Sequence, residues 1–264
     1  MLSQQELVQN LKERLRIAVL QPPAAAVSSG SRPLDRLLGG GWHAGTLVEC
    51  FSGGGGGATS LALLAARAVC GQRGESHDRS SPAECRGPQE KPRKQEQRTL
   101  VVVDGKRRFY PPAAAAWQVD LENLFVVCPA NAREHHWAVH QALSCPAVGA
   151  VLCWPERLDA RMFRRLQLAA ETSGSLGLLV RPAEARGKPS WAQMQLGVEG
   201  VPIETPPVEN RRRLRVELLR SRGSGSGQSV ELEVDERGRL YETNSLPVVS
   251  ELAPAATWQR SAGA

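Results

Sequence analysis

Residues 46–70 read TLVECFSGGGGGATSLALLAARAVC, and this stretch decides the fold. Its first part, residues 46–51, is a short apolar run that is typical of a buried strand. A tract of five glycines at residues 53–57 follows. Residues 58–70 are then rich in strong helix formers and almost free of charge. The predicted order of elements is therefore strand, glycine loop and helix.

The same alternation continues along the chain. Further strands are predicted by apolar runs at residues 100–104, 124–128, 148–154 and 176–181. Helical patterns separate these runs at residues 111–118, 132–143 and 159–172. Strands separated by helices imply an α/β domain with a mostly parallel sheet and helices on both faces. An antiparallel edge with a flexible hairpin is predicted by period-two runs at residues 192–198, 214–220 and 230–234.

Three segments are expected to lie outside the core, which we place at residues 22–242. Residues 1–21 predict an amphipathic helix with leucines at four-residue spacing: Leu7, Leu11 and Leu15. Residues 71–98 lack apolar periodicity and are dense in charged and polar residues, which predicts a disordered surface insertion. Residues 243–264 are rich in Ser, Pro and Ala and predict a flexible tail, which contains Trp258.

The composition predicts a soluble, cytoplasmic protein. Net charge is +6, a basic excess that favours an anionic partner without identifying it. The six cysteines form no C-x-x-C pair, and most lie beside apolar residues, as reduced buried thiols do. Residues 1–21 lack the uninterrupted apolar run of a signal peptide, and no later stretch approaches the length of a membrane span.

The glycine tract departs from the phosphate-binding pattern G-x-x-x-x-G-K-[ST], in which backbone N–H groups and a lysine hold the phosphates. The matching window reads Ser52-Gly53-Gly54-Gly55-Gly56-Gly57-Ala58-Thr59, with Ala58 in place of the lysine. Loss of such a charge costs on the order of several kcal/mol in phosphoryl transfer. Ordering flexible glycines costs about 1 kcal/mol or more per residue. We expect no cofactor, with weak residual nucleotide or anion binding as the alternative.

Around this tract the chain resembles RecA. Residues 29–41, SGSRPLDRLLGGG, look like the segment that leads into the RecA core, and residues 45–49, GTLVE, like its first strand. Other segments are similar to the ImuA family, the RecA-like accessory proteins of bacterial mutagenic repair: ARE at 132–134, GAVL at 149–152, RRLQLAAE at 164–171 and GLLVRP at 177–182. The likeness covers roughly residues 28–240 and implies a RecA-like P-loop NTPase fold.

The departures from RecA fall on positions that would carry chemistry in an active ATPase. Where such enzymes place a catalytic glutamate after the second core strand, this chain has Lys106, which is no base at neutral pH. The strand that should end in a Mg²⁺-binding aspartate is followed by Trp154, with Glu156 behind a proline. Together with Ala58, these changes predict that the chain is not an enzyme.

The resemblance implies a non-catalytic accessory protein of error-prone translesion synthesis in the bacterial DNA-damage response, acting by protein–protein binding. The implied partners are the Y-family polymerase-like protein ImuB and an error-prone replicative-type DNA polymerase, with RecA as a further candidate. Candidate partner contacts outside the core are Leu7, Leu11, Leu15 and Trp258.

Two alternatives stay open. The first is a DNA-binding or RecA-modulating protein whose candidate phosphate contacts are Lys106, Arg107, Arg108, Arg157, Arg161, Arg164 and Arg165. A solvated helix face explains the arginines equally well. The second is a divergent ATPase that uses Lys106 or another lysine. His136 and His140 have a spacing that zinc sites use, but no third ligand accompanies them, so we expect no metal site.

Overall fold

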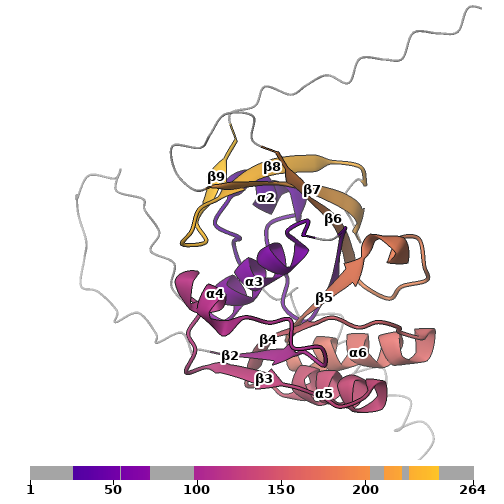
Figure 1. Ribbon diagram of the computed structural model, residues 1–264. Helices are drawn as coiled ribbons and strands as arrows, with labels where there is room; N and C mark the ends of the chain where they lie inside the picture. Colours follow the sequence, from indigo (N-terminus) through magenta and orange to yellow (C-terminus); the bar gives the residue numbers. More distant parts are fainter. Residues whose placement is uncertain (1–25, 54, 72–97, 203–210, 222–225, 244–264) are drawn as a thin grey trace, which may run out of the picture.

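A computed structural model describes residues 26–53, 55–71, 98–202, 211–221 and 226–243. These ranges leave out the predicted N-terminal helix with Leu7, Leu11 and Leu15, and the predicted tail from residue 244 with Trp258. They also leave out residues 72–97 of the predicted insertion and 222–225 of the predicted hairpin. The described residues form one nine-stranded sheet with the order β3-β2-β4-β5-β1-β6-β7-β8-β9 (Figure 1).

The first half of the sheet is parallel. It consists of β1 (Leu47–Ser52), β2 (Thr99–Val103), β3 (Leu124–Val127), β4 (Val148–Cys153) and β5 (Leu176–Pro182). β2 lies between β3 and β4, and β5 joins β4 to β1, with every pairing parallel. The four central strands are apolar almost throughout, because both of their faces are covered. The predicted parallel sheet is confirmed.

The second half of the sheet is antiparallel. Its strands are β6 (Met194–Val201), β7 (Arg212–Ser221), β8 (Ser229–Val234) and β9 (Leu240–Glu242). β6 runs parallel to β1 on one side and antiparallel to β7 on the other, and β8 and β9 extend the sheet outward. The predicted antiparallel edge is confirmed, and β9 adds a short strand that the sequence pattern did not predict.

Helices cover both faces of the parallel half, as expected (Figure 1). The helices are α2 (Arg32–Leu37), α3 (Ala58–Val69), α4 (Pro111–Ala116), α5 (Ala132–Ser144) and α6 (Ala160–Ser173), with a 3₁₀ turn at Ala183–Ala185. α3 and α4 pack on one face, whereas α5 and α6 pack on the other. Within the described ranges, no helix has the length and hydropathy that crossing a membrane requires.

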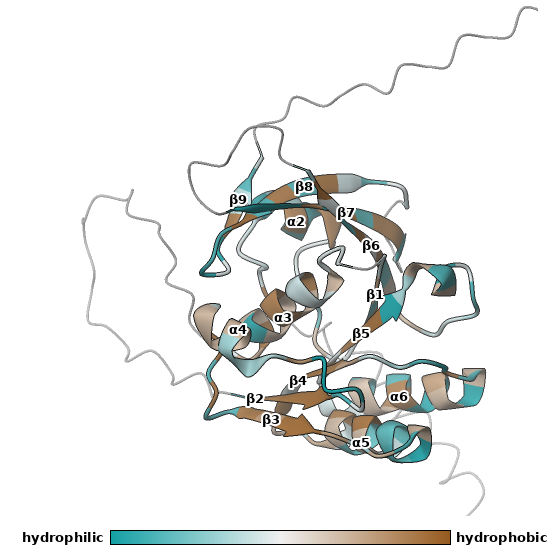
Figure 2. Ribbon diagram, in the orientation of Figure 1, coloured by the Kyte–Doolittle hydropathy of each residue, from teal (hydrophilic) through white to brown (hydrophobic). Residues whose placement is uncertain are grey.

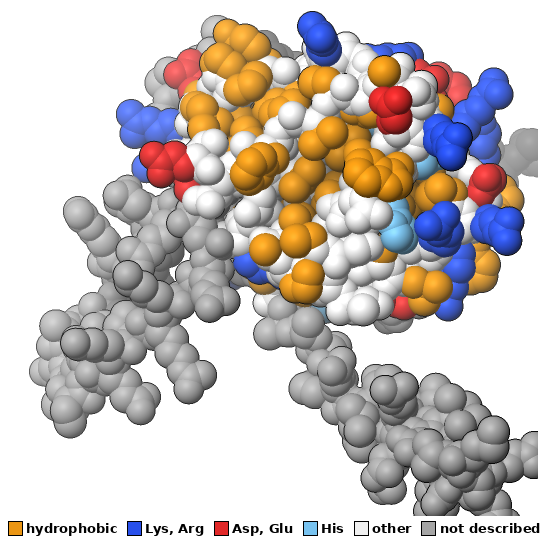
Figure 3. Space-filling view, turned by 90° about the horizontal axis from the view of Figure 1, so that it is seen from below, with side chains coloured by type: hydrophobic (Ala, Val, Ile, Leu, Met, Phe, Trp, Pro, Cys, Tyr) orange, Lys and Arg blue, Asp and Glu red, His pale blue; other side chains and the backbone are white. Residues whose placement is uncertain are grey.

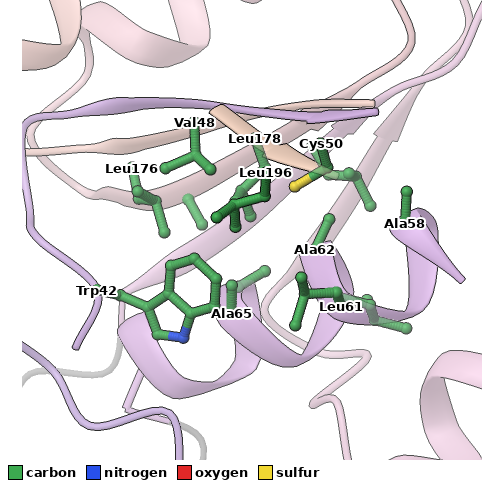
Figure 4. Packing of buried hydrophobic residues seen from close by; sticks show 14 of the residues in the cluster. Trp42, Val48, Cys50, Ala58, Leu61, Ala62, Ala65, Leu176, Leu178 and Leu196 are labelled. Atoms are coloured by element: carbon green, nitrogen blue, oxygen red, sulfur yellow. The ribbon is translucent and has the colours of Figure 1, made fainter. Parts of the chain in front are cut away.

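Successive side chains of β1 point to opposite faces of the sheet and pack in two separate hydrophobic cores. Val48 and Cys50 point toward α3, where they meet apolar residues of the helix, and Trp42 packs at the end of this layer (Figure 4). Leu47 points to the opposite face, where Phe163 of α6 helps to form the second core. In Figure 2 the central strands are coloured hydrophobic, while α5 and α6 carry hydrophilic residues as well. The helices are therefore amphipathic and the strands are apolar on both sides.

Three cysteines are buried in these cores, and burial raises the pKa of Cys50, Cys70 and Cys153 to about 12. These thiols stay protonated at neutral pH and act as small apolar side chains. Cys128 and Cys145 are exposed, so three of the five described cysteines are buried.

The two ends of the predicted insertion belong to the core. The N–H of Arg98 donates to the carbonyl of Cys70 at 3.3 Å, so the chain leaves and returns at adjacent points. The guanidinium of Arg98 donates to the carbonyls of Gly174 and Pro146 at 2.9 Å each. Arg98 therefore ties the start of β2 to neighbouring loops.

A buried ion pair joins the two strands at the centre of the sheet. Glu49 of β1 has no exposed surface, and its carboxylate accepts a hydrogen bond from Arg181 of β5 at 2.5 Å. Its other oxygen accepts from Ser190 at 2.6 Å and from Gln195 of β6 at 2.7 Å. One carboxylate thus collects donors from three segments, and this compensates part of the cost of burying its charge.

Replacing Glu49 by Ala should destabilise the protein by about 3–5 kcal/mol, because the buried Arg181 charge would lose its partner. The matched control is Glu231→Ala, which breaks the half-exposed pair with Arg215 and should cost less than about 1 kcal/mol. Urea denaturation followed by circular dichroism measures both losses. Equal losses in the two variants would contradict the role assigned to Glu49.

Candidate functional site

The glycine loop lies between β1 and α3, as the sequence predicts. Gly57 is the residue before α3 and has a φ of 88°, and Gly55 has a φ of 79°. Residues other than glycine rarely adopt this left-handed conformation. The N–H of Gly56 donates to the carbonyl of Gly53 at 3.1 Å and so folds the loop on itself. Ser52, at the end of β1, donates through its hydroxyl to the same carbonyl at 2.8 Å.

Leu214 of β7 packs against this loop. A Cβ atom placed on Gly57 would lie 2.4 Å from Cδ2 of Leu214, so the leucine side chain would have to shift to admit it. Ala58 is only 1% exposed and belongs to the core on the α3 face. The position that would hold the phosphate-binding lysine is therefore occupied by a methyl group packed in the core.

Arg212 and Arg213 of β7, with Arg211 just before the strand, line the pocket at the loop, which has a volume of about 520 Å³. Arg213 pairs with Glu233 of β8 at 2.8 Å, and Arg211 pairs with the same carboxylate at 3.5 Å. Arg211 also lies over the ring of Tyr241 at 4.1 Å. The charges of these two arginines are thus partly balanced within the sheet, whereas Arg212 is exposed beside the loop.

Trp154 reaches the first turn of α3. It follows β4, and its indole Nε1 donates to Oγ1 of Thr59 at 3.4 Å. β5 separates β4 from β1 in the sheet, so only a large side chain spans the gap at this edge. In a working P-loop the threonine hydroxyl binds Mg²⁺. Here that hydroxyl faces an indole N–H instead.

The segment after β2 is held by its own aspartate. Asp104 is buried, and its carboxylate accepts the N–H groups of Lys106 at 3.1 Å and of Phe109 at 2.6 Å. The ammonium of Lys106 pairs with Glu156, which follows β4. The hydrogen bond and the charge of Lys106 hold the pKa of Glu156 below its usual value. Asp104, Lys106 and Glu156 all have partners within the protein.

A second cavity, of about 260 Å³, opens at the carboxyl ends of β2, β3 and β4. We call it the β2–β4 cleft. Lys106, Arg108 and Arg157 line it together, so three of the predicted basic residues converge although they come from two loops. Trp154, His135 and His136 contribute further walls. The cleft shares no lining residue with the pocket at the glycine loop.

The remaining predicted basic residues lie elsewhere. Arg107 is exposed in the turn after β2, with a φ of 53°. Arg161 and Arg165 are exposed on α6. Arg164 donates to Gln167 at 2.5 Å and lies 5.1 Å from the ring of Trp191, so it is engaged within the protein.

Arg157 lies outside the helix that carries Arg161, Arg164 and Arg165. α6 begins at Ala160, because Asp159 accepts the N–H of Met162 at 2.7 Å and caps the helix. Arg157 precedes the helix and lines the cleft instead. The helical spacing from Arg157 to Arg161 therefore has no structural meaning.

Two histidines of α5 contribute to the cleft. Nε2 of His136 lies 3.0 Å from the carbonyl of Arg157, which ties α5 to the loop after β4. His135, which the sequence analysis did not single out, hydrogen-bonds to the backbone of Val103, and its Nε2 is buried with no partner among the described residues. No group of three or more potential metal ligands occurs in the part of the chain that the structure describes. Only its place just after a strand end marks His135 in the sequence.

Comparison with known proteins supports the architecture. The crystal structure of the RadB recombinase is similar over 82% of this chain and 99% of that chain, with a TM-score of 0.59 and 15% sequence identity. The fold is RecA-like. No family model and no curated protein sequence matches the chain. The fold class expected from the sequence is confirmed, while the finer likeness to the ImuA family rests on the residues quoted above.

The glycine loop offers a test of packing. Gly57→Ala should cost about 1–2 kcal/mol for the left-handed backbone and roughly 1–3 kcal/mol more for the clash with Leu214. Gly55→Ala is the control, since its φ is also positive but no atom lies within 4 Å of an added Cβ. Thermal unfolding measures the difference. If both variants lose the same stability, Leu214 does not constrain the loop.

Acid should destabilise the protein through His135. Burial, and then the neighbouring His136, lower the pKa of His135 below its usual value. The unfolded chain takes up the proton near pH 6.5, whereas the folded one resists it, so stability falls as the pH drops below about 6.5. His135→Gln should flatten this loss in urea denaturation between pH 7.5 and pH 5. An unchanged slope would show that His135 is protonated freely.

Proposed function

We propose that this chain is a non-catalytic RecA-like accessory protein of the error-prone translesion synthesis machinery, acting by protein–protein binding. The RecA-like fold supports a role in DNA repair. The resemblance of residues 132–134, 149–152, 164–171 and 177–182 to the ImuA family supports the narrower assignment. Its partners in this proposal are ImuB and an error-prone replicative-type polymerase, with RecA as a further candidate.

The observation that carries the non-catalytic role is the geometry around Thr59. Ala58, the residue before Thr59, is packed in the core. The hydroxyl of Thr59 faces the indole of Trp154. Phosphoryl transfer depends almost wholly on positioned positive charge and Mg²⁺. A triphosphate on this loop would meet no lysine from the loop, and a metal at Thr59 would have to displace the indole. This arrangement argues against hydrolysis.

The same geometry weakens the divergent ATPase as an alternative. Lys106 would have to replace the missing lysine, but its ammonium pairs with Glu156 at the β2–β4 cleft. That cleft has no lining residue in common with the glycine loop.

The free edge of β3 supports binding to a partner protein. β3 ends the sheet, and its Phe125 is 60% exposed, with Val126 and Val127 also exposed. Trp137 of α5 is 65% exposed as well. Figure 3 shows the face on the side of β3 and α5, where hydrophobic side chains gather across the middle. Apolar sheet edges without charged protection are sites where another chain adds a strand.

We therefore assign β3 as the docking strand for an extended apolar segment of a polymerase partner. Phe125 aligns with Val101 in the register of the two strands, which places it on the face that α5 covers. Phe125 and Trp137 would then anchor one side of the incoming segment, while the backbone of β3 supplies hydrogen bonds. Aromatic anchors contribute most of the affinity at such interfaces.

The non-catalytic role is tested by titrating fluorescent ATP with Mg²⁺ into the purified chain up to millimolar concentration, beside an assay of phosphate release. We expect neither tight binding nor turnover. Steady turnover that Lys106→Ala abolishes would overturn the proposal in favour of the divergent ATPase.

The partner surface is tested by recovery of each purified partner on the immobilised chain. Phe125→Glu and Trp137→Glu should each reduce recovery about tenfold or more, since a charge at an anchor position costs at least 1.4 kcal/mol of binding. Leu168→Glu is the control, because Leu168 is an exposed apolar residue of α6. Full recovery with both edge variants, and loss on deleting residues 1–21 or 243–264, would move the contact to Leu7, Leu11 and Leu15 or to Trp258.

A further inference from the structure

The β2–β4 cleft lies where the chain connections of the sheet diverge. From β2 the chain moves outward to β3 through α4, whereas from β4 it moves in the opposite direction to β5 through α6. α4 packs on the α3 face and α6 packs on the other face. In open α/β sheets such a switch point leaves a crevice at the carboxyl ends of the strands, and ligands bind there. The topology thus marks this cleft independently of the glycine loop.

Positive charge enters the cleft from both of its walls. Lys106 and Arg108 come from the segment after β2, and Arg157 comes from the segment after β4. The first turn of α5 also lines the cleft, but Glu134 already accepts the N–H of Ala130 at 2.9 Å. The arginine and lysine side chains, rather than the helix end, therefore supply the charge that an anion would meet.

The rest of the lining suits a flat ring. Trp154 lines the cleft while its Nε1 is anchored on Thr59, so the indole is fixed in place. Pro129 and Ala130 add apolar surface. His135 lines the cleft as well, and its buried Nε2 has no hydrogen-bond partner in the described part of the chain. A buried polar atom without a partner is costly and calls for a donor from elsewhere.

We propose that the β2–β4 cleft binds a nucleoside phosphate, with the phosphate at Arg108 and Arg157 and the base against Trp154. An exocyclic amine of the base would serve as the donor that His135 lacks. The volume of about 260 Å³ suits a single nucleotide and excludes a duplex. The nucleotide is either free in solution or one unit of a single strand of DNA. This inference stands apart from the proposed partner binding, which uses the edge of β3.

Glu156 provides a built-in competitor for the phosphate. Its ion pair with Lys106 joins the two walls, and both side chains are more than half exposed, at 65% and 59%. An incoming phosphate would take over Lys106 from this carboxylate. Removing the negative charge should therefore strengthen binding, whereas removing a positive charge from the cleft should weaken it.

The test is a titration of the full chain with AMP and with a fluorescein-labelled single-stranded oligodeoxyadenylate, whose base carries the same exocyclic amine, with inorganic phosphate as a third probe. Arg108→Gln and Arg157→Gln should each weaken binding about tenfold, as expected for loss of one charge-assisted contact. Glu156→Gln should tighten it roughly threefold or more. Arg237→Gln, an exposed arginine in the turn before β9, makes the same charge change outside the cleft and should leave affinity unchanged.

The probes separate the two sources of the nucleotide. If the oligonucleotide does not displace AMP, the ligand of the cleft is a free nucleotide. If the two probes compete, the ligand is a unit of single-stranded DNA. Both outcomes support the proposal if Glu156→Gln and Arg108→Gln change the affinity in opposite directions. No binding of either nucleotide probe at millimolar concentration overturns it. If Arg237→Gln and Arg108→Gln weaken nucleotide binding equally, the proposal is overturned in favour of diffuse electrostatic attraction. If only Arg212→Gln weakens binding, the ligand lies at the glycine loop and the proposal is overturned as well. Recovery of a polymerase partner by Arg108→Gln is scored separately, so failure here leaves the β3 proposal standing.

Discussion

The structure depends on the burial of β1 on both faces and along both edges. Leu47 and Val48 enter opposite cores, and the strand is paired with β5 on one side and β6 on the other. Such a strand cannot move without exposing apolar surface in two layers at once. Its only charged side chain, Glu49, must therefore be compensated where it stands, and Arg181 does so.

This fixed strand sets the geometry of everything at its carboxyl end. The glycine loop turns directly from β1 into α3, and α3 packs across β4, β5, β1 and β6. The loop therefore has the place of a phosphate-binding loop whatever its sequence. It differs from the phosphate-binding pattern in that Ala58 packs in the core, while Leu214 lies against Gly57.

Trp154 lies between the glycine loop and the β2–β4 cleft. One edge of its indole contacts Thr59 at the glycine loop, and the side chain also lines the β2–β4 cleft. A single side chain therefore shapes both places.

Sequence patterns predicted the regular elements well because burial on two faces leaves long apolar runs, as in β2 and β4. They failed for short elements such as β9, whose three residues carry no periodicity of their own.

The sequence by itself determined the α/β class, the strand–loop–helix unit and the absence of a lysine at position 58, since these follow from local composition and spacing. The tertiary structure alone decided that Lys106, Arg108 and Arg157 share one cleft, that Trp154 contacts Thr59 and that β3 is the last strand of the sheet among the described residues. The physical reason is that parallel strands bring their carboxyl ends together only after long crossover connections have closed. Contacts across such connections depend on strand order, which no local pattern encodes.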